Sequence, residues 1–227
     1  MATKTASKQA VSILDPNWQR LRVPVKGVSP GLMTHRWSEK ARKMIADGQA
    51  GPKVKKAKEA RDPEAEFLGA IYHFKPGRYS DTTELTRLTK ATRYGFPANA
   101  FKKAMVRACK VVDGVAMADA RICFFVVGDS GDLVEIKTDE LPTMQTDSVR
   151  IGMGKTTLAY RPLFTDWTAT LTVEFDGDVF QPDDIINLIK KAGIQVGVGE
   201  RRPEKEGNTF GRWAVLTDSI ELEEIEL

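Results

Sequence analysis

Residues 168–216, TATLTVEFDGDVFQPDDIINLIKKAGIQVGVGERRPEKEGNTFGRWAVL, decide the fold class of this chain. Apolar and polar residues alternate at its start, which predicts a strand with one side against a core. Pro182 begins a helix, because its missing N–H has no partner in the first turn, and Gly193 is placed to end that helix. Strands are expected at 194–198 and at the final RWAVL. The stretch predicts a strand, a helix and two further strands.

The same order of elements is expected upstream. The apolar runs at 67–74 and 121–127 favour buried strands, a helix is expected from Pro97, and LVEI at 133–136 should complete a hairpin with the second run. We therefore expect an α+β fold of two βαββ halves, ferredoxin-like or RNA-recognition-like, with mainly antiparallel sheet and helices on one face.

Three segments follow from these expectations. Residues 1–66 hold a strand around Leu21 and Val23, a helix capped by Ser38 and a basic arm. Residues 67–150 form the first βαββ half. Residues 151–227 form the second half and end in an acidic tail.

Composition describes an ordinary globular chain with uneven charge. It has 227 residues, 41% hydrophobic and 29% charged, and a net charge of +3. No run approaches the roughly 20 apolar residues of a membrane helix, and the N-terminus lacks a secretory apolar region, so we expect a cytoplasmic protein without a membrane partner. Cys109 and Cys123 are expected as reduced thiols. Residues 36–61 hold nine Lys and Arg against three acids, and the last ten residues hold five acids. A polyanion partner, an acidic tail from the same or another subunit, or a solvated helix face would each explain that basic segment.

The loop after Val196 is the main candidate site. Its glycines permit positive φ and close approach of the backbone, its cations suit phosphate or carboxylate, and its tryptophan offers a face for stacking. An ordinary hairpin loop, with the tryptophan in the core and Arg201 paired to a nearby glutamate, explains the same pattern. The residues concerned are Gly197, Gly199, Arg201, Arg202, Lys205, Arg212 and Trp213.

Catalytic and metal-binding patterns receive no support. GMGKTT at 152–157 lacks the first glycine of a phosphate loop, and GVGERR at 197–202 lacks the third glycine of a dinucleotide fingerprint. His35 and His73 are the only histidines and have no ligand spacing. We expect no catalytic residue, no metal and no cofactor.

The wording of several segments resembles an uncharacterised family of tailed-phage and prophage proteins. The resemblance rests on VKGVSPGLMTHRWSEKARKMI with ARDPEAEF, and on YGFPANAFKKAM, VRIG, YRPLFTDW and AGIQVGVGERRPEKEGNTFGRW. It covers most of residues 23–215. It implies a phage origin, a bacterial cytoplasm and an accessory role, and it supplies no activity.

Three functions remain open at this point. The first is a non-enzymatic accessory protein that forms a homo-oligomer and binds nucleic acid. Its phosphate contacts would come from the loop and from the arm residues Lys53, Lys55, Lys56 and Lys58, with Tyr94 and Trp213 as stacking partners. The second is a counter-defence protein that captures a signalling nucleotide or blocks a host defence protein. The third is a viral structural or assembly protein.

Overall fold

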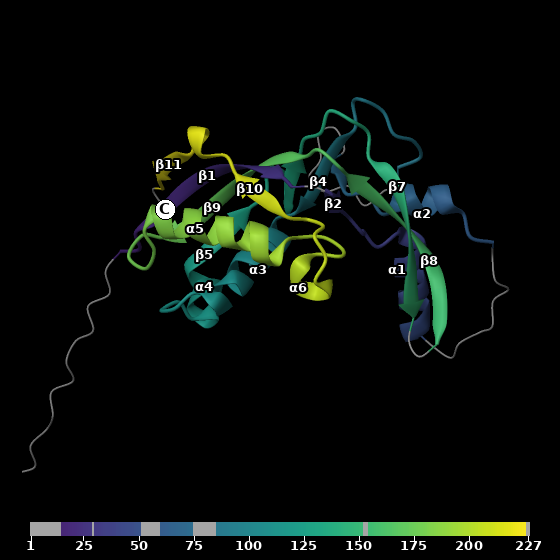
Figure 1. Ribbon diagram of the computed structural model, residues 1–227, viewed down its shortest axis with the longest axis horizontal. Coiled ribbons are helices and arrows are strands. Elements are labelled where there is room, and N and C mark those ends of the chain that lie inside the picture. The colour runs from purple at the N-terminus through teal and green to yellow at the C-terminus, as the bar shows by residue number, and fades with distance from the viewer. Residues whose placement is uncertain (1–14, 29, 51–59, 75–84, 152–153, 226–227) are drawn as a thin grey trace, which may run out of the picture.

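The chain folds around an antiparallel sheet, shown by a computed structural model that describes residues 15–28, 30–50, 60–74, 85–151 and 154–225 (Figure 1). The strands are β1 Trp18–Gly27, β2 Leu32–Met33, β3 His73–Phe74, β4 Arg93–Pro97, β5 Phe124–Val127, β6 Leu133–Ile136, β7 Thr143–Ile151, β8 Lys155–Phe164, β9 Thr168–Asp176, β10 Trp213–Val215 and β11 Glu221–Glu224. The helices are α1 Glu39–Ala50, α2 Pro63–Gly69, α3 Ala98–Ala108, α4 Met117–Cys123, α5 Pro182–Lys191 and α6 Pro203–Glu206. Short helical turns are η1 Cys109–Val111, η2 Ala192–Val196 and η3 Thr217–Ser219.

The main sheet has the strand order β10-β1-β9-β5, and all its neighbours are antiparallel. Helix α3 precedes β5 in the chain and α5 precedes β10, so β1, α3, β5, β9, α5 and β10 together make a βαββαβ unit. Alternate residues of β1 and β9, among them Val23 and Val173, are buried under the helices. The predicted α+β fold with antiparallel sheet is confirmed.

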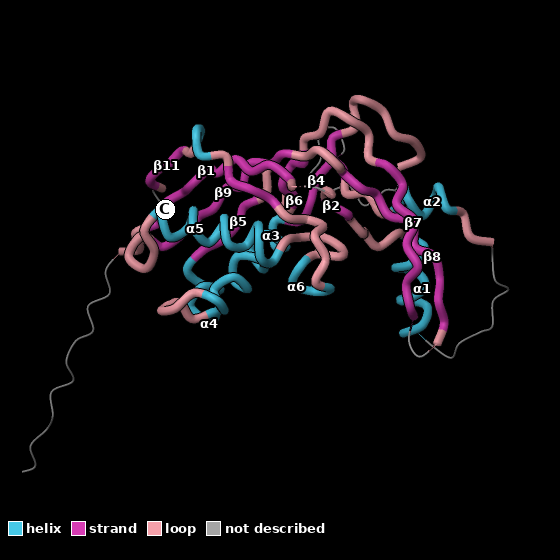
Figure 2. Tube along the Cα trace, in the orientation of Figure 1, coloured by secondary structure: helices cyan, strands magenta, loops and turns pink. Residues whose placement is uncertain are grey.

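Two long insertions build a second part of the molecule. Residues 28–97 separate β1 from α3, and residues 128–167 separate β5 from β9. They supply two small sheets, β2-β8-β7 and β3-β4-β6. In Figures 1 and 2, β7, β8, α1 and α2 project to one side. We call these four elements the arm, which is a different unit from the basic arm predicted from the sequence, and we call the remainder the body. The body draws strands from all three predicted segments, because β9 pairs with β1 on one side and with β5 on the other.

Aromatic side chains hold the helices on the sheet. Trp213 of β10 is fully buried, and its ring meets that of Phe101 on α3 edge to face at 5.5 Å between ring centres. Gly193 permits this packing, because a Cβ there would lie 2.3 Å from the carbonyl oxygen of Trp213. At Gly211, where φ is +68°, a Cβ would lie 1.7 Å from the carbonyl oxygen of Val198. Both glycines are therefore required by close approach of the backbone.

Several expected elements are wrong in detail. Residues 67–69 of the strand predicted at 67–74 belong to the helix α2, because Asp62 accepts hydrogen bonds from the N–H groups of Glu64 and Ala65 and so caps a helix that starts at Pro63. Only His73 and Phe74 of the predicted strand form a strand. The run at 121–127 is divided between the end of α4 and β5. Strand β6 pairs with β4, so the expected hairpin with β5 does not form.

The end of α5 also differs from expectation. The helix continues past Gly193 as the π-helical turn η2, which replaces most of the predicted strand at 194–198, and it ends at Gly197 with φ +71°. Gly193 is therefore a packing glycine and does not cap the helix. The start of α5 is as predicted, since the N–H of Gln181 donates to the Asp184 carboxylate at 3.0 Å.

The acidic tail forms β11, which pairs with β1, and the Glu223 carboxylate lies 3.7 Å from the guanidinium of Arg20. The described part of the tail therefore meets β1. Within the described residues, no helix is long and apolar enough to cross a membrane.

Candidate nucleic-acid interface

The glycine–arginine loop is shaped by backbone conformation. Gly197 and Gly199 have φ of +71° and +78°, and Arg201 itself has φ +54°. A Cβ at Gly199 would lie 2.3 Å from the carbonyl oxygen of Met33. The close approach that this glycine permits is therefore to the backbone of β2 and not to a ligand. The loop is consequently fixed against β2 before any ligand is considered.

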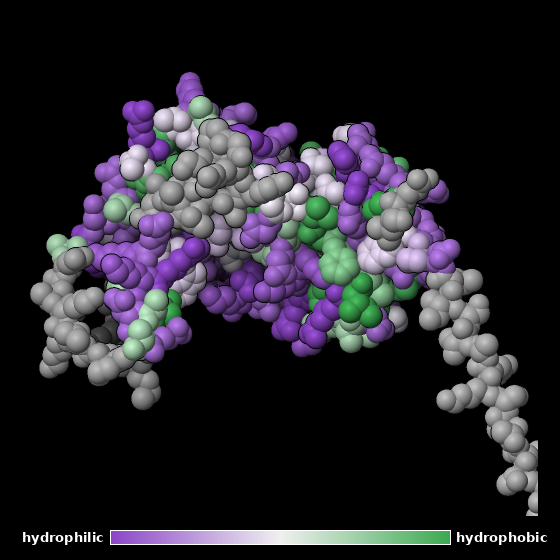
Figure 3. Space-filling view, turned by 180° about the vertical axis from the view of Figure 1, so that it is seen from behind, coloured by the Kyte–Doolittle hydropathy of each residue, from purple (hydrophilic) through white to green (hydrophobic). Residues whose placement is uncertain are grey.

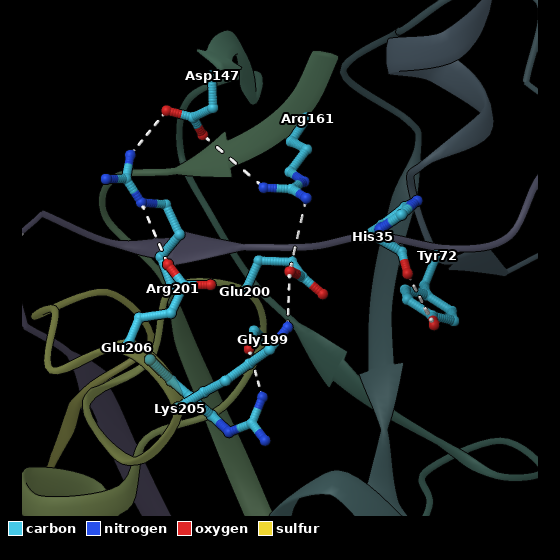
Figure 4. A network of polar contacts seen from close by, with 10 residues as sticks. His35, Tyr72, Asp147, Arg161, Gly199, Glu200, Arg201, Lys205 and Glu206 are labelled. Atoms are coloured by element: carbon cyan, nitrogen blue, oxygen red, sulfur yellow. Dashed lines mark hydrogen bonds and ion pairs between the residues drawn. The ribbon is translucent and has the colours of Figure 1, made fainter. Parts of the chain in front are cut away.

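The cations of this loop are held by carboxylates (Figure 4). Arg201 donates to Asp147 at 2.7 Å and lies 3.8 Å from Glu206. Lys205 lies 3.6 Å from Glu200, which a second cation, Arg161 of β8, approaches at the same distance. Because Arg201 and Lys205 each have a negative neighbour, these two cations offer little free charge for an anion.

Of the remaining predicted loop residues, Arg202 and Trp213 are held by contacts within the protein. Arg202 lies 3.1 Å from Glu204 and donates to the carbonyl oxygen of Gly199. Arg212 is half buried, and its Nε has no hydrogen-bond partner within the described residues. Trp213 and Tyr94 are 0% and 5% exposed, so neither can stack on a base, and that expectation is wrong. Their apolar rings are more stable inside the core.

The basic segment at 36–61 is only partly described. Lys53, Lys55, Lys56 and Lys58 lie outside the described residues. Arg36 is 4% exposed and is therefore part of the interior, whereas Arg61 forms an ion pair with Glu66. The helix expected after Ser38 is present as α1, and the Ser38 hydroxyl caps it by accepting from the N–H of Ala41.

A groove along α3 offers unpaired positive charge. One cleft, of about 390 Å³, lies between α3, the glycine loop and the segments that carry His35 and Tyr72, and a second, of about 400 Å³, lies between α3 and α4. Lys103 and Arg107 line both clefts, which joins them into one groove. Figure 3 shows hydrophilic residues over the hollow between arm and body. We call the four cations along this path the basic groove: Lys102, Lys103, Arg107 and Arg121.

The four cations differ in how strongly they are held. Lys102 donates to the carbonyl oxygen of Arg121 at 2.8 Å and lies 3.7 Å from the ring centre of Phe125, and its burial lowers the pKa of its ammonium group. Arg107 lies 3.1 Å from Glu204. Lys103 and Arg121 are exposed and have no ion pair within the described part of the chain. These two cations are therefore the most available for phosphate.

Aromatic side chains stand at the arm end of the groove. His35 and Tyr72 line the first cleft, and the Tyr72 hydroxyl lies 3.5 Å from the carbonyl oxygen of His35 (Figure 4). The His35 ring is stacked on Trp37 with 6.1 Å between ring centres and 15° between planes. Desolvation at the cleft lowers the pKa of His35, so its ring is neutral at pH 7. Trp37 is 54% exposed.

These groove residues were not the ones that the sequence favoured. The sequence patterns favour the loop after Val196 and give His35 no role as a metal ligand. Two signals were present: three cations without an acid on one predicted helix, and a tryptophan within the basic THRWSEKARK.

Motifs that were rejected for nucleotide chemistry lie in other structures. Lys155, Thr156 and Thr157 of the GKT sequence belong to strand β8, and Gly154 precedes that strand with φ +106°. Within the described residues, no group of three or more His, Cys, Asp or Glu side chains is placed to hold a metal ion. Cys109 and Cys123 are free thiols, and burial raises the pKa of each.

Comparison with known proteins gives little for this chain. No family model matches it, and neither does any curated protein. Among solved structures it is similar to a chain in the structure of the Type III-B Cmr-beta complex bound to cognate target RNA, with a TM-score of 0.45 and 10% identity. The similarity covers 92% of this chain and 61% of that chain, so this chain spans less than two thirds of the length of the chain it matches.

Proposed function

We propose that this protein is a nucleic-acid-binding accessory protein of a tailed phage or prophage, acting by binding and without catalysis. The observation that carries the proposal is the basic groove, in which four cations line one continuous path and only Arg107 has an acidic partner within the described residues. The phage setting rests on the sequence resemblance given above.

The spacing of charge in the groove suits a polyanion. Lys103 and Arg107 are one turn apart on α3 and project on the same side, and Arg121 lies across the second cleft from them. A chain of phosphates can contact such a row in succession, and each contact releases counterions. A carboxylate ligand would use only one or two of these cations.

Salt-dependent binding tests the proposal. Fluorescence anisotropy of labelled single-stranded DNA, RNA and duplex DNA should show an affinity that falls steeply between about 50 and 200 mM salt. Absence of salt-sensitive affinity for all three polymers refutes the proposed function.

A second candidate function is capture of a small nucleotide, and the size of the first cleft favours it. About 390 Å³ is within the range of small-molecule sites, roughly 300–1,000 Å³. Lys103, Arg107 and Arg202 line this cleft together with Phe96 and with two acids, Glu200 and Glu204. Calorimetry with cyclic and linear nucleotides tests this function. Saturable one-to-one binding of a free nucleotide, together with weak binding of polymers, would replace the first proposal.

A further inference from the structure

We infer that the arm end of the groove is a base-stacking platform formed by Trp37 and His35, which makes the protein selective for single-stranded nucleic acid. This inference rests on the proposed function, since it names the form of nucleic acid that the groove accepts. It concerns residues other than the cations already described.

The first step is the exposure of Trp37. An indole that is 54% exposed leaves much apolar surface in water, while the tryptophans Trp167 and Trp213 are fully buried. The neighbouring His35 ring lies nearly parallel to it, at 15°. Two parallel rings at the surface present flat faces to which a base can add.

The second step is the connection of this platform to the groove. His35 lines the same cleft as Lys103 and Arg107, which places the platform at one end of the path of cations. Tyr72 and Phe96 line the cleft beside it, with ring centres 5.7 Å apart and edge-to-face geometry. A strand whose phosphates follow α3 therefore has aromatic and apolar surface for its bases at the arm end.

The third step is the state of the strand. Stacking on a side chain requires a base whose face is free, and in a duplex both faces are covered by neighbouring base pairs. The neutral His35 ring adds surface without adding charge at pH 7. Single strands therefore gain contacts at Trp37 that duplexes of equal charge do not.

The test compares an intact single strand, an abasic strand of the same length and a duplex, with tryptophan fluorescence and anisotropy as readouts. The intact strand should bind about fivefold to a hundredfold more tightly than the abasic strand for each stacked base. It should also quench tryptophan fluorescence, because Trp37 is the most exposed tryptophan. Trp37→Phe should keep the affinity and lose most of the quenching. Trp37→Leu should lose most of the preference for the intact strand over the abasic strand.

The outcomes separate the inference from the proposed function. Salt-sensitive binding of intact and abasic strands with equal affinity, or unchanged selectivity in Trp37→Leu, overturns the platform and leaves the proposed function standing. No binding of any strand at low salt overturns both. Circular dichroism of each variant shows that it is folded, and because Trp37 is exposed, its replacement removes no core contact.

Discussion

Removal of the two available groove cations, in the variant Lys103→Ala/Arg121→Ala, should weaken nucleic-acid binding in a way that depends on salt. Both side chains are exposed, line the second cleft and lack an ion pair among the described residues. Their loss therefore leaves no carboxylate without a partner, and stability should change by less than about 0.5 kcal/mol.

The magnitude follows from the number of phosphates lost. Each phosphate contact with a single strand contributes about 0.7 to the slope of log affinity against log salt, so two contacts contribute about 1.4. At about 0.1 M salt, relative to 1 M, this corresponds to roughly a 25-fold loss of affinity. Arg107 and Lys102 remain, so binding is weakened without being abolished.

The matched control is Lys190→Ala/Lys191→Ala. These residues form the last turn of α5, are exposed and line neither cleft, while their removal changes the net charge by the same amount. Anisotropy titrations at several salt concentrations give both slopes. If the control loses as much slope as the groove variant, net charge alone attracts the nucleic acid and the groove has no special role.

Three further predictions concern stability and are measured by urea unfolding. Asp147→Ala should lower the free energy of unfolding by about 3 kcal/mol, because its carboxylate, 10% exposed, lies between two arginines that would lose a buried partner. Glu206→Ala, at a 39% exposed side chain, should lower it by less than about 1 kcal/mol. Equal costs would show that the buried pair is not structural. Gly211→Ala should cost several times more stability than Gly207→Ala, since both positions have positive φ but only Gly207 has open space for a Cβ. Gly207→Ala should cost about 1–2 kcal/mol. Similar costs for the two variants would contradict the close backbone approach at Gly211. Desolvation lowers the pKa of His35 below 6.5, so the contribution of this residue to stability is complete above pH 6.5 and is lost as the pH falls through its folded pKa. The stability difference between the wild type and His35→Gln should therefore decrease on acidification. A constant difference would contradict this sign.

The parts of the fold that sequence predicted are those with long periodic patterns. Strand β9 alternates over nine residues and α5 begins with proline and two acids, so local physics alone specifies both. The short apolar run at 67–74 gave no such period. There the capping signal at Asp62 and Pro63 decides for a helix, which the apolar residues alone do not reveal.

Which strands pair with one another could not be predicted from the sequence, for a different reason. Strand β6 follows β5 closely in the chain, and a hairpin is the usual result of such spacing. Strand β6 instead pairs with β4, which belongs to the 28–97 insertion, and β5 pairs with β9 in the main sheet. Such choices depend on contacts between distant segments, for which one sequence carries no local pattern. The burial of Trp213 is a consequence of the same kind, since β10 is held against α5 and β1.

The structure favours α3 over the loop as the candidate site, because the loop contains acidic residues and α3 contains none. In the loop, ERRPEKE at 200–206 alternates the signs of charge, so every cation finds a carboxylate within a few residues. In α3, ANAFKKAMVRA has three cations and no acid, and helical spacing keeps Lys103 and Arg107 on one side. A count of positive charges ranks the two segments alike, but the local balance of charge does not. Arg107 is still paired with Glu204 of α6, but Lys103 has no ion pair within the described residues and remains available to a partner in the groove.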